Sequence, residues 1–107
     1  MKYKKITQDD VYRKIVAISV NVMNSFHAIN ISNLASLLGT SRYQVKKYID
    51  ELKNKGFVEL KCFNLSTDEE LYPPYWGYHL TEKGRDTDYY REQERQEEEL
   101  IKECFGA

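Results

Sequence analysis

Apolar residues recur at helical spacing early in the chain and predict one long helix over residues 8–25. Thr7, followed three residues later by Asp10, resembles a capping box at its start. The helix carries two apolar stripes, one of Val11, Ile15, Ile18 and Val22, and the other of Tyr12, Val16, Ser19, Met23 and Phe26. A surface helix needs only one such stripe, so this helix is buried on two sides. It is either the central helix of its own domain or packed against a second subunit, and we favour the second subunit.

The next segment predicts a short extended piece at residues 29–31 and a short helix at 33–38. Ser32 is expected to cap this helix, and Gly39 to end it, because glycine readily adopts the left-handed conformation found there.

A second short helix follows almost at once. Ser41 and Gln44 have capping-box spacing, Gly56 closes the segment, and a single apolar stripe runs between them, made of Val45, Ile49 and Leu52. Two short helices joined by so short a turn have the spacing of a helix-turn-helix, which we place at residues 31–56.

The face of this second helix opposite its apolar stripe is polar and partly basic. It carries Tyr43, Lys47, Asp50 and Asn54, flanked by Lys46 and Lys53. Arg42, Tyr43 and Gln44 occupy the first turn, which is the part of a recognition helix that meets base edges in the major groove. Lysines on the outer face of a helix are common and are weak evidence of DNA binding by themselves. Their position on the second helix of a helix-turn-helix makes the evidence stronger.

Alternating residues then predict a hairpin over residues 57–80, with strands at 57–63 and 76–80. One face of the first strand has Val58, Leu60 and Cys62, and Cys62 is interpreted as a small core residue. On the second strand, Tyr78 and Leu80 are expected to point inward and His79 outward.

A last helix is predicted over residues 81–105, capped by Thr81 and weakened by Gly84. Residues 91–99 include no apolar side chain, so this part is expected to project into solvent or lie along a polar surface. The end of the helix has a small apolar tip of Leu100, Ile101, Cys104 and Phe105, which calls for a partner.

Composition narrows the class of protein. The 107 residues suit one domain, and the charge is asymmetric: residues 1–56 contain 10 Lys or Arg and 4 Asp or Glu, whereas residues 57–107 contain 6 and 13. A basic half is expected of a nucleic-acid-binding protein. Two widely spaced cysteines favour a reducing compartment, for which we expect the cytoplasm. The longest apolar run, residues 15–23, is too short to span a membrane, so no membrane partner is expected.

Catalytic and metal-binding patterns are not evident in the sequence. His27 and His79 have no carboxylate or thiol at a recognisable spacing, and there is no phosphate-binding glycine loop, HExxH or CxxC motif. We therefore expect no enzyme activity and no metal or other cofactor.

The stretch ISNLASLLGTSRYQVKKYIDELKNKGFVEL, closed by YHLTEKGR, resembles the DNA-binding domain of the MarR and PadR groups of bacterial transcriptional regulators. The resemblance covers residues 31–85 and implies an α+β, mainly α, winged helix-turn-helix fold in a single domain, residues 1–107, with the hairpin as its wing. In such proteins the recognition helix docks in the major groove of double-stranded DNA, the wing touches the neighbouring backbone or minor groove, and terminal helices form a dimer.

The resemblance also assigns residues. The DNA-facing positions of the family fall on Ser41, Arg42, Tyr43, Gln44, Lys46 and Lys47, to which we add Lys53 from its helix face and Arg85 just after the wing. Dimer contacts of a homodimer are expected from Tyr12, Val16, Met23, Leu100, Ile101 and Phe105. Together these features predict a sequence-specific transcriptional regulator.

The wing departs from the family pattern. Its tip has Asp68, Glu69 and Glu70 where Arg or Lys is usual, and a phosphate backbone would repel them. One alternative is a winged-helix protein-interaction module of a mobile-element or replication complex that uses the acidic wing and the last helix. Another is a ligand-responsive regulator whose pocket is lined by Tyr72, Tyr75, Trp76 and Tyr78, although these rings are more simply explained as packing the wing against the body.

Overall fold

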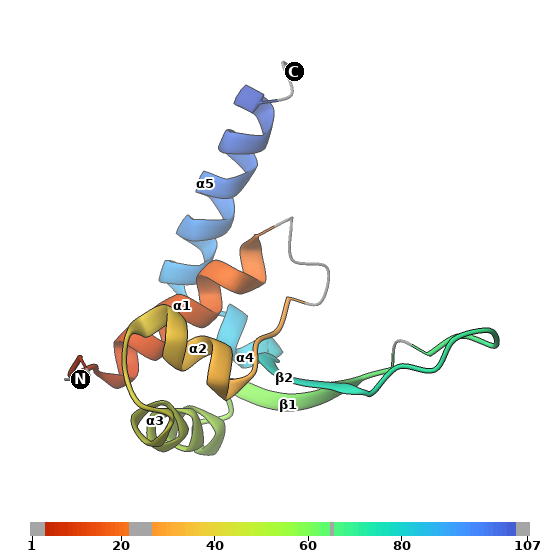
Figure 1. Cartoon of the computed structure of the whole chain (residues 1–107). Helices are drawn as coiled ribbons and strands as arrows, with labels where there is room; N and C mark the ends of the chain where they lie inside the picture. Colours follow the sequence, from red (N-terminus) through yellow and green to blue (C-terminus); the bar gives the residue numbers. More distant parts are fainter. Residues whose placement is uncertain (1–3, 22–26, 65, 105–107) are drawn as a thin grey trace.

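Three helices form the body of the molecule, from which a β-hairpin and a last helix project in different directions (Figure 1). The computed structural model describes residues 4–21, 27–64 and 66–104. The elements in chain order are α1 (Gln8–Val20), α2 (Ile31–Leu38), α3 (Arg42–Asn54), β1 (Val58–Phe63), β2 (Tyr75–Leu80), α4 (Glu82–Arg85) and α5 (Asp88–Cys104). The order of helices and strands is that of the predicted winged helix-turn-helix.

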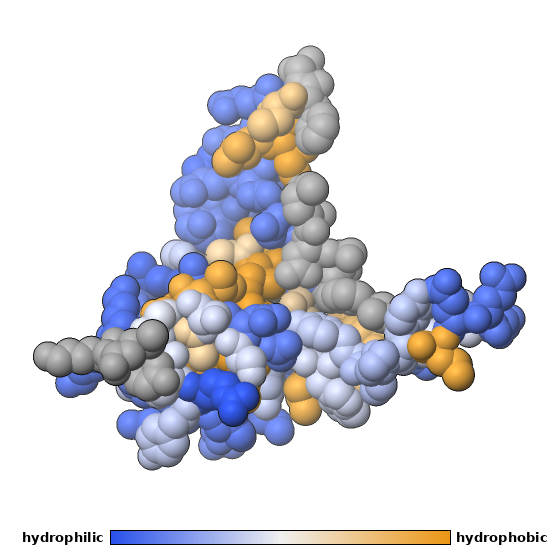
Figure 2. Space-filling model, viewed as in Figure 1, coloured by the Kyte–Doolittle hydropathy of each residue, from blue (hydrophilic) through white to orange (hydrophobic). Residues whose placement is uncertain are grey.

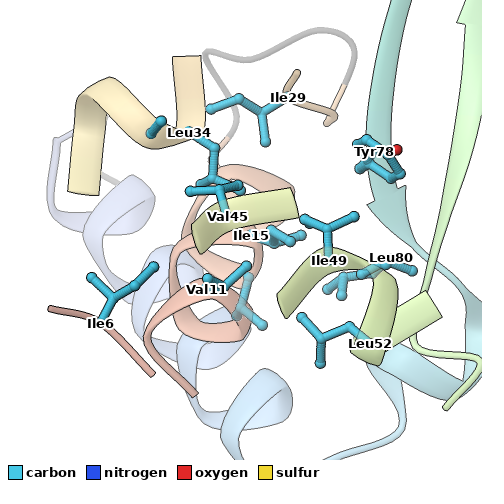
Figure 3. Close-up of a cluster of buried hydrophobic side chains, with 13 residues drawn as sticks. Ile6, Val11, Ile15, Ile29, Leu34, Val45, Ile49, Leu52, Tyr78 and Leu80 are labelled. Carbon is cyan, nitrogen blue, oxygen red and sulfur yellow. The ribbon is translucent and has the colours of Figure 1, made fainter. Parts of the chain in front are cut away.

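The core gathers apolar side chains from α1, α2, α3 and the base of the hairpin (Figure 3). Its fully buried members are Val11, Ile15, Val16, Leu34, Val45, Ile49, Leu52, Val58 and Leu80. Both stripes of α1 contribute to this set, since Ile15 and Val16 are each enclosed by the chain itself. The second-subunit explanation that we favoured is therefore not needed for the described part of α1, which is the central helix of its own core.

Two helix ends differ from the prediction. Asn21 already has extended backbone after α1, and the predicted end at Ser25 lies outside the described residues. Asn30, not Ser32, caps α2, because its Oδ1 accepts a hydrogen bond from the Asn33 N–H at 2.8 Å. Asparagine caps helices as well as serine does, and Asn30 directly precedes the first helical residue, Ile31.

The predicted starts of α1 and α3 and the stop of α2 are confirmed. Thr7 and Asp10 form a full capping box. Ser41 Oγ accepts from the Gln44 N–H at 3.2 Å, and Gly39 adopts a left-handed conformation with φ 66°. The Gln44 side chain does not complete a box with Ser41 but donates to the Lys4 carbonyl at 3.4 Å.

The hairpin extends well beyond the body, which overturns the prediction for Cys62 (Figure 1). β1 and β2 pair antiparallel, with Val58 opposite Leu80 and Cys62 opposite Trp76. Val58 and Leu80 are buried at the base, but Leu60 is 42% exposed and Cys62 is exposed. Alternation places these residues on one face as predicted, but the core covers that face only near its base.

The last predicted helix is broken into two. Asp86 has a non-helical backbone, with φ −90° and ψ 60°. A new helix, α5, begins after Thr87, whose Oγ1 accepts a hydrogen bond from the Tyr90 N–H at 3.1 Å. The Tyr12 hydroxyl donates to the Gly84 carbonyl at 2.8 Å and lies 2.6 Å from Thr87 Oγ1. Tyr12 thus fixes α1 to the joint between α4 and α5.

None of the described residues of α5 is buried, as its polar middle predicted. The helix is stabilised by ion pairs along its own surface, in which Arg95 contacts Glu92 at 2.6 Å and also Glu99. The pKa of Glu92 is lowered to about 2, mainly by the hydrogen bond from Arg95 and to a smaller extent by one from Gln96. In the part of the chain that the structure describes, no helix has both the length and the apolar character needed to cross a membrane.

Candidate nucleic-acid interface

The exposed face of α3 brings together most, but not all, of the residues predicted to meet DNA. Val45, Ile49 and Leu52 anchor the opposite face in the core, so the register of the helix is fixed. As a result, Arg42, Tyr43, Lys46, Lys47 and Lys53 all lie exposed. Tyr43 is 79% exposed at the first turn, where its ring is open to a partner.

The first turn of α3 is held in place by neighbouring segments. Arg42 Nη1 donates to Ser32 Oγ of α2 at 3.2 Å. Gln44 is joined to the chain that precedes α1, through its 3.4 Å bond to the Lys4 carbonyl. Lys4 lies 40 residues before Gln44, so no local pattern in the sequence signals this contact. These bonds set the directions of two side chains that we expect to read bases.

The lysines of α3 are in different electrostatic surroundings. Lys46 Nζ lies 2.6 Å from Asp50 Oδ1, and this hydrogen bond raises the pKa of Lys46 above its usual value. The ammonium of Lys47 lies 5.4 Å from the centre of the Tyr48 ring, where the ring face attracts it. Asp50 therefore offsets part of the positive charge of this face near Lys46.

Arg85 lies on α4 instead of α3. It lines a cavity of about 540 Å³ together with Lys61 and His79 of the hairpin and Tyr90 of α5. Burial is the main cause that raises the pKa of Tyr90, while the positive charge of Arg85 acts in the opposite direction. The structure thus groups Arg85 with the hairpin and α5.

The acidic tip of the wing is a compact turn. The Thr67 N–H donates to the Glu70 carbonyl at 2.8 Å, and the Glu70 N–H donates to Thr67 Oγ1 at 3.0 Å. The Tyr72 hydroxyl hydrogen bonds to the Glu70 carboxylate, which raises the pKa of Tyr72. Asp68 and Glu69 are exposed on this turn, so the acids face solvent at the far end of the hairpin.

The four wing aromatics do not share a pocket. Tyr75 and Trp76 are consecutive in β2 and so lie on opposite faces of the hairpin. Tyr78 is part of the core, whereas Trp76 is 53% exposed and Tyr72 is also exposed. Packing against the body is thus confirmed for Tyr78 but not for Trp76 or Tyr72.

The histidines have partners that the sequence did not reveal. His79 Nε2 lies 2.8 Å from Glu59 Oε1, its neighbour across the hairpin. His27 Nδ1 lies 2.7 Å from the Ser19 carbonyl oxygen. Within residues 4–21, 27–64 and 66–104, no three His, Cys, Asp or Glu side chains are grouped so as to hold a metal ion.

The residues predicted for dimerisation fall into three groups. Val16 is enclosed in the core and so is not presented to a second copy, whereas Tyr12 is partly buried and its hydroxyl is bonded within the chain. Leu100 is 55% exposed and is followed in α5 by Ile101. Figure 2 shows apolar surface toward the far end of this helix. Met23 and Phe105 lie outside the described residues.

Three comparisons with known proteins were made, and one of them, with solved structures, found a protein of similar architecture. No family model matches the chain, and no curated protein matches it in sequence. Among solved structures, it is similar to the crystal structure of the zinc-dependent MarR family transcriptional regulator AdcR in the Zn(II)-bound state, with a TM-score of 0.50 and 18% identity over 99% of this chain. The chain spans 62% of the length of that structure. At this identity the likeness is one of fold, and it shows that the chain has a winged helix-turn-helix fold, as that regulator does.

Proposed function

We propose that this protein binds double-stranded DNA as a dimer and regulates transcription, with α3 as its recognition helix. The observation that supports this most strongly is the outer face of α3, where Tyr43 and three lysines lie exposed opposite a fully buried stripe. The likeness of fold to a transcriptional regulator supports the same function.

The roles of the side chains follow from their positions on the helix. Arg42, Tyr43 and Gln44, in the first turn, read base edges, because a recognition helix enters the major groove with its N-terminal end leading. Lys46, Lys47 and Lys53 bind phosphates along the same groove, Ser41 holds the start of the helix, and Arg85 adds a backbone contact beside the wing.

A salt series tests this assignment. Duplex binding is measured by fluorescence anisotropy for the intact chain and for the double variant Arg42→Ala with Lys47→Ala. Removal of one base contact and one phosphate contact is expected to weaken binding about 10-fold to 100-fold and to lower the salt slope by about 1.

The matched control is Arg91→Ala with Lys102→Ala, which removes the same two side-chain types from α5. This control is expected to keep the affinity and the slope of the intact chain. If both double variants behave like the intact chain, α3 is not the recognition helix.

The acidic wing favours a second candidate, a protein-interaction module. Asp68, Glu69 and Glu70 lie at the end of a hairpin that projects from the body, where a protein partner can reach them (Figure 1). Neutralising all three, as Asp68→Asn, Glu69→Gln and Glu70→Gln, separates the two functions. A DNA-binding protein is expected to bind duplex equally or more tightly after this change, because repulsion from phosphates is removed. An interaction module is expected to show no duplex affinity either before or after it.

A further inference from the structure

The chain that precedes α1 is fixed beside the turn of the helix-turn-helix. We call residues 4–7 the N-terminal arm. The Lys4 N–H donates to the Gly39 carbonyl at 2.9 Å, and the Lys4 carbonyl accepts from Gln44 Nε2 at 3.4 Å. Two positions further on, Ile6 is 2% exposed and belongs to the core. The arm is therefore held at both ends against the body and has a defined course.

This course places the arm next to the first turn of α3. Gln44, which it touches, is one of the side chains that we expect at base edges. The arm and the hairpin lie on opposite sides of α3 in the view of Figure 1. A duplex whose major groove receives α3 has a phosphate backbone along each edge of that groove, so the arm faces one backbone and the wing the other.

The two lysines of the arm are available for such a contact. Lys4 and Lys5 are both exposed, and neither takes part in an ion pair with any residue that the structure describes. The carboxylates at the start of α1 have other partners: Asp9 pairs with Arg13 at 2.7 Å, and Asp10 accepts from the Thr7 N–H at 2.9 Å. Lys4 also lines a small cavity together with Lys14, Arg13 and Asp10 of α1.

We infer that Lys4 and Lys5 form a second phosphate-binding surface on the side of α3 away from the wing. This inference rests on the proposed function. The wing ends in Asp68, Glu69 and Glu70 and is poorly suited to grip a backbone. The arm supplies two positive charges on the other flank, in addition to the backbone contact that we propose for Arg85 beside the wing. Because its backbone is already fixed, little ordering is needed on binding.

The test uses two double variants of the full chain. The arm variant combines Lys4→Gln and Lys5→Gln. The control combines Lys83→Gln on α4 and Lys102→Gln on α5, and it changes the net charge by the same amount. Binding is measured by anisotropy on a labelled duplex of mixed sequence about three helical turns long, across a salt series. Thermal unfolding of each variant checks that the fold is kept.

The arm variant is expected to bind several-fold more weakly at low salt. Its salt slope is expected to fall by about one to two, because each lysine that is removed leaves one phosphate without its protein cation. The control is expected to keep the slope of the intact chain. Lys4→Arg with Lys5→Arg is expected to bind like the intact chain, since the interaction depends on charge.

Four results would overturn the inference. An unchanged slope in the arm variant means that the lysines do not touch phosphates, and an equal fall in the control means that the effect follows net charge alone. If the intact chain binds no duplex, the proposed function fails and the inference with it. If Arg42→Ala with Lys47→Ala weakens binding while the arm variant does not, the proposed function stands and only the arm assignment fails.

Discussion

At the scale of single residues, Gly84 is the position where a methyl group is least tolerated. A Cβ added there would lie 2.1 Å from the Phe57 carbonyl oxygen, and backbone cannot move aside as a side-chain end does. Overpacking of this kind typically costs about 1–3 kcal/mol and occasionally more. Gly84→Ala is therefore expected to lower the free energy of unfolding by at least this amount, as measured by urea denaturation.

Gly39→Ala is the matched control. Nothing lies within 4 Å of a Cβ at Gly39, so only its left-handed backbone, with φ +66°, opposes the change. That conformation costs about 1–2 kcal/mol for a residue with a side chain. If Gly39→Ala proves the more damaging of the two, the close approach of Gly84 to Phe57 is not as the structure has it.

Glu92 provides a prediction about pH. Its pKa is lowered from 4.5 to about 2, chiefly by the hydrogen bond from Arg95. Because the folded pKa is the lower one, the stabilisation is present above about pH 4.5 and is lost as the pH falls toward 2. NMR titration of the Glu92 carboxyl carbon is expected to show a midpoint near 2, and Arg95→Gln is expected to return it toward 4.5. A normal midpoint in the intact chain would contradict the ion pair.

At the scale of elements, the joint between α4 and α5 depends on Tyr12 and Thr87. Tyr12→Phe removes the hydroxyl that contacts Gly84 and Thr87, and is expected to cost about 1 kcal/mol of stability. Thr87→Val removes the cap of α5 as well, for a cost of about 1 kcal/mol or more.

The double variant Tyr12→Phe with Thr87→Val tests whether the two hydroxyls act together. Since they are in contact, the double variant is expected to lose less stability than the sum of the single losses, as measured by chemical denaturation. Additive losses would mean that the 2.6 Å contact contributes nothing.

How well each element could be predicted depends on how local its causes are. The stripe of Val45, Ile49 and Leu52 and the cap at Ser41 are set by neighbours in sequence, and both were predicted correctly. Cys62 was not, because alternation assigns a strand residue to a face without showing whether the core extends far enough to cover it. The break at Asp86 was not predicted because Tyr12, which fixes the joint, lies far from it in sequence.

The candidate site shows the same division. The exposed face of α3 follows from helical periodicity, so the sequence predicts which side chains it carries. The link from Gln44 to Lys4 and the pairing of Glu59 with His79 arise from tertiary contacts, for which no spacing rule exists. The width of the apolar surface on α1 predicted burial on two sides but not which neighbour covers each side.

At the scale of the whole molecule, we expect the far end of α5 to join two copies. Leu100 is 55% exposed there, on a helix that has no buried side chain among its described residues. Sedimentation equilibrium of the intact protein is expected to show a dimer. Leu100→Asp is expected to weaken the dimer at least tenfold, because it places a charge in an apolar contact.

Glu103→Ala is the control for this change, since it alters an exposed polar residue on the same turn of helix. It is expected to leave the dimer intact. The dimer interface does not lie on α5 if the unmodified protein is a monomer, or if both variants weaken the dimer equally. The prediction of paired half-sites about 10 base pairs apart, which requires a symmetric dimer, then loses its support.

A small rotation of α5 at the joint formed by Asp86 and Thr87 displaces its far end by a larger distance. Its 17 residues span about 25 Å, so a turn of about 10° at the base displaces the far end by about 4 Å. In a dimer joined at those far ends, the same turn changes the distance between the two α3 helices. In the dimer that we propose, the Tyr12 hydroxyl, which bonds to Gly84 and Thr87 at this joint, is therefore expected to influence which spacing of half-sites the protein accepts.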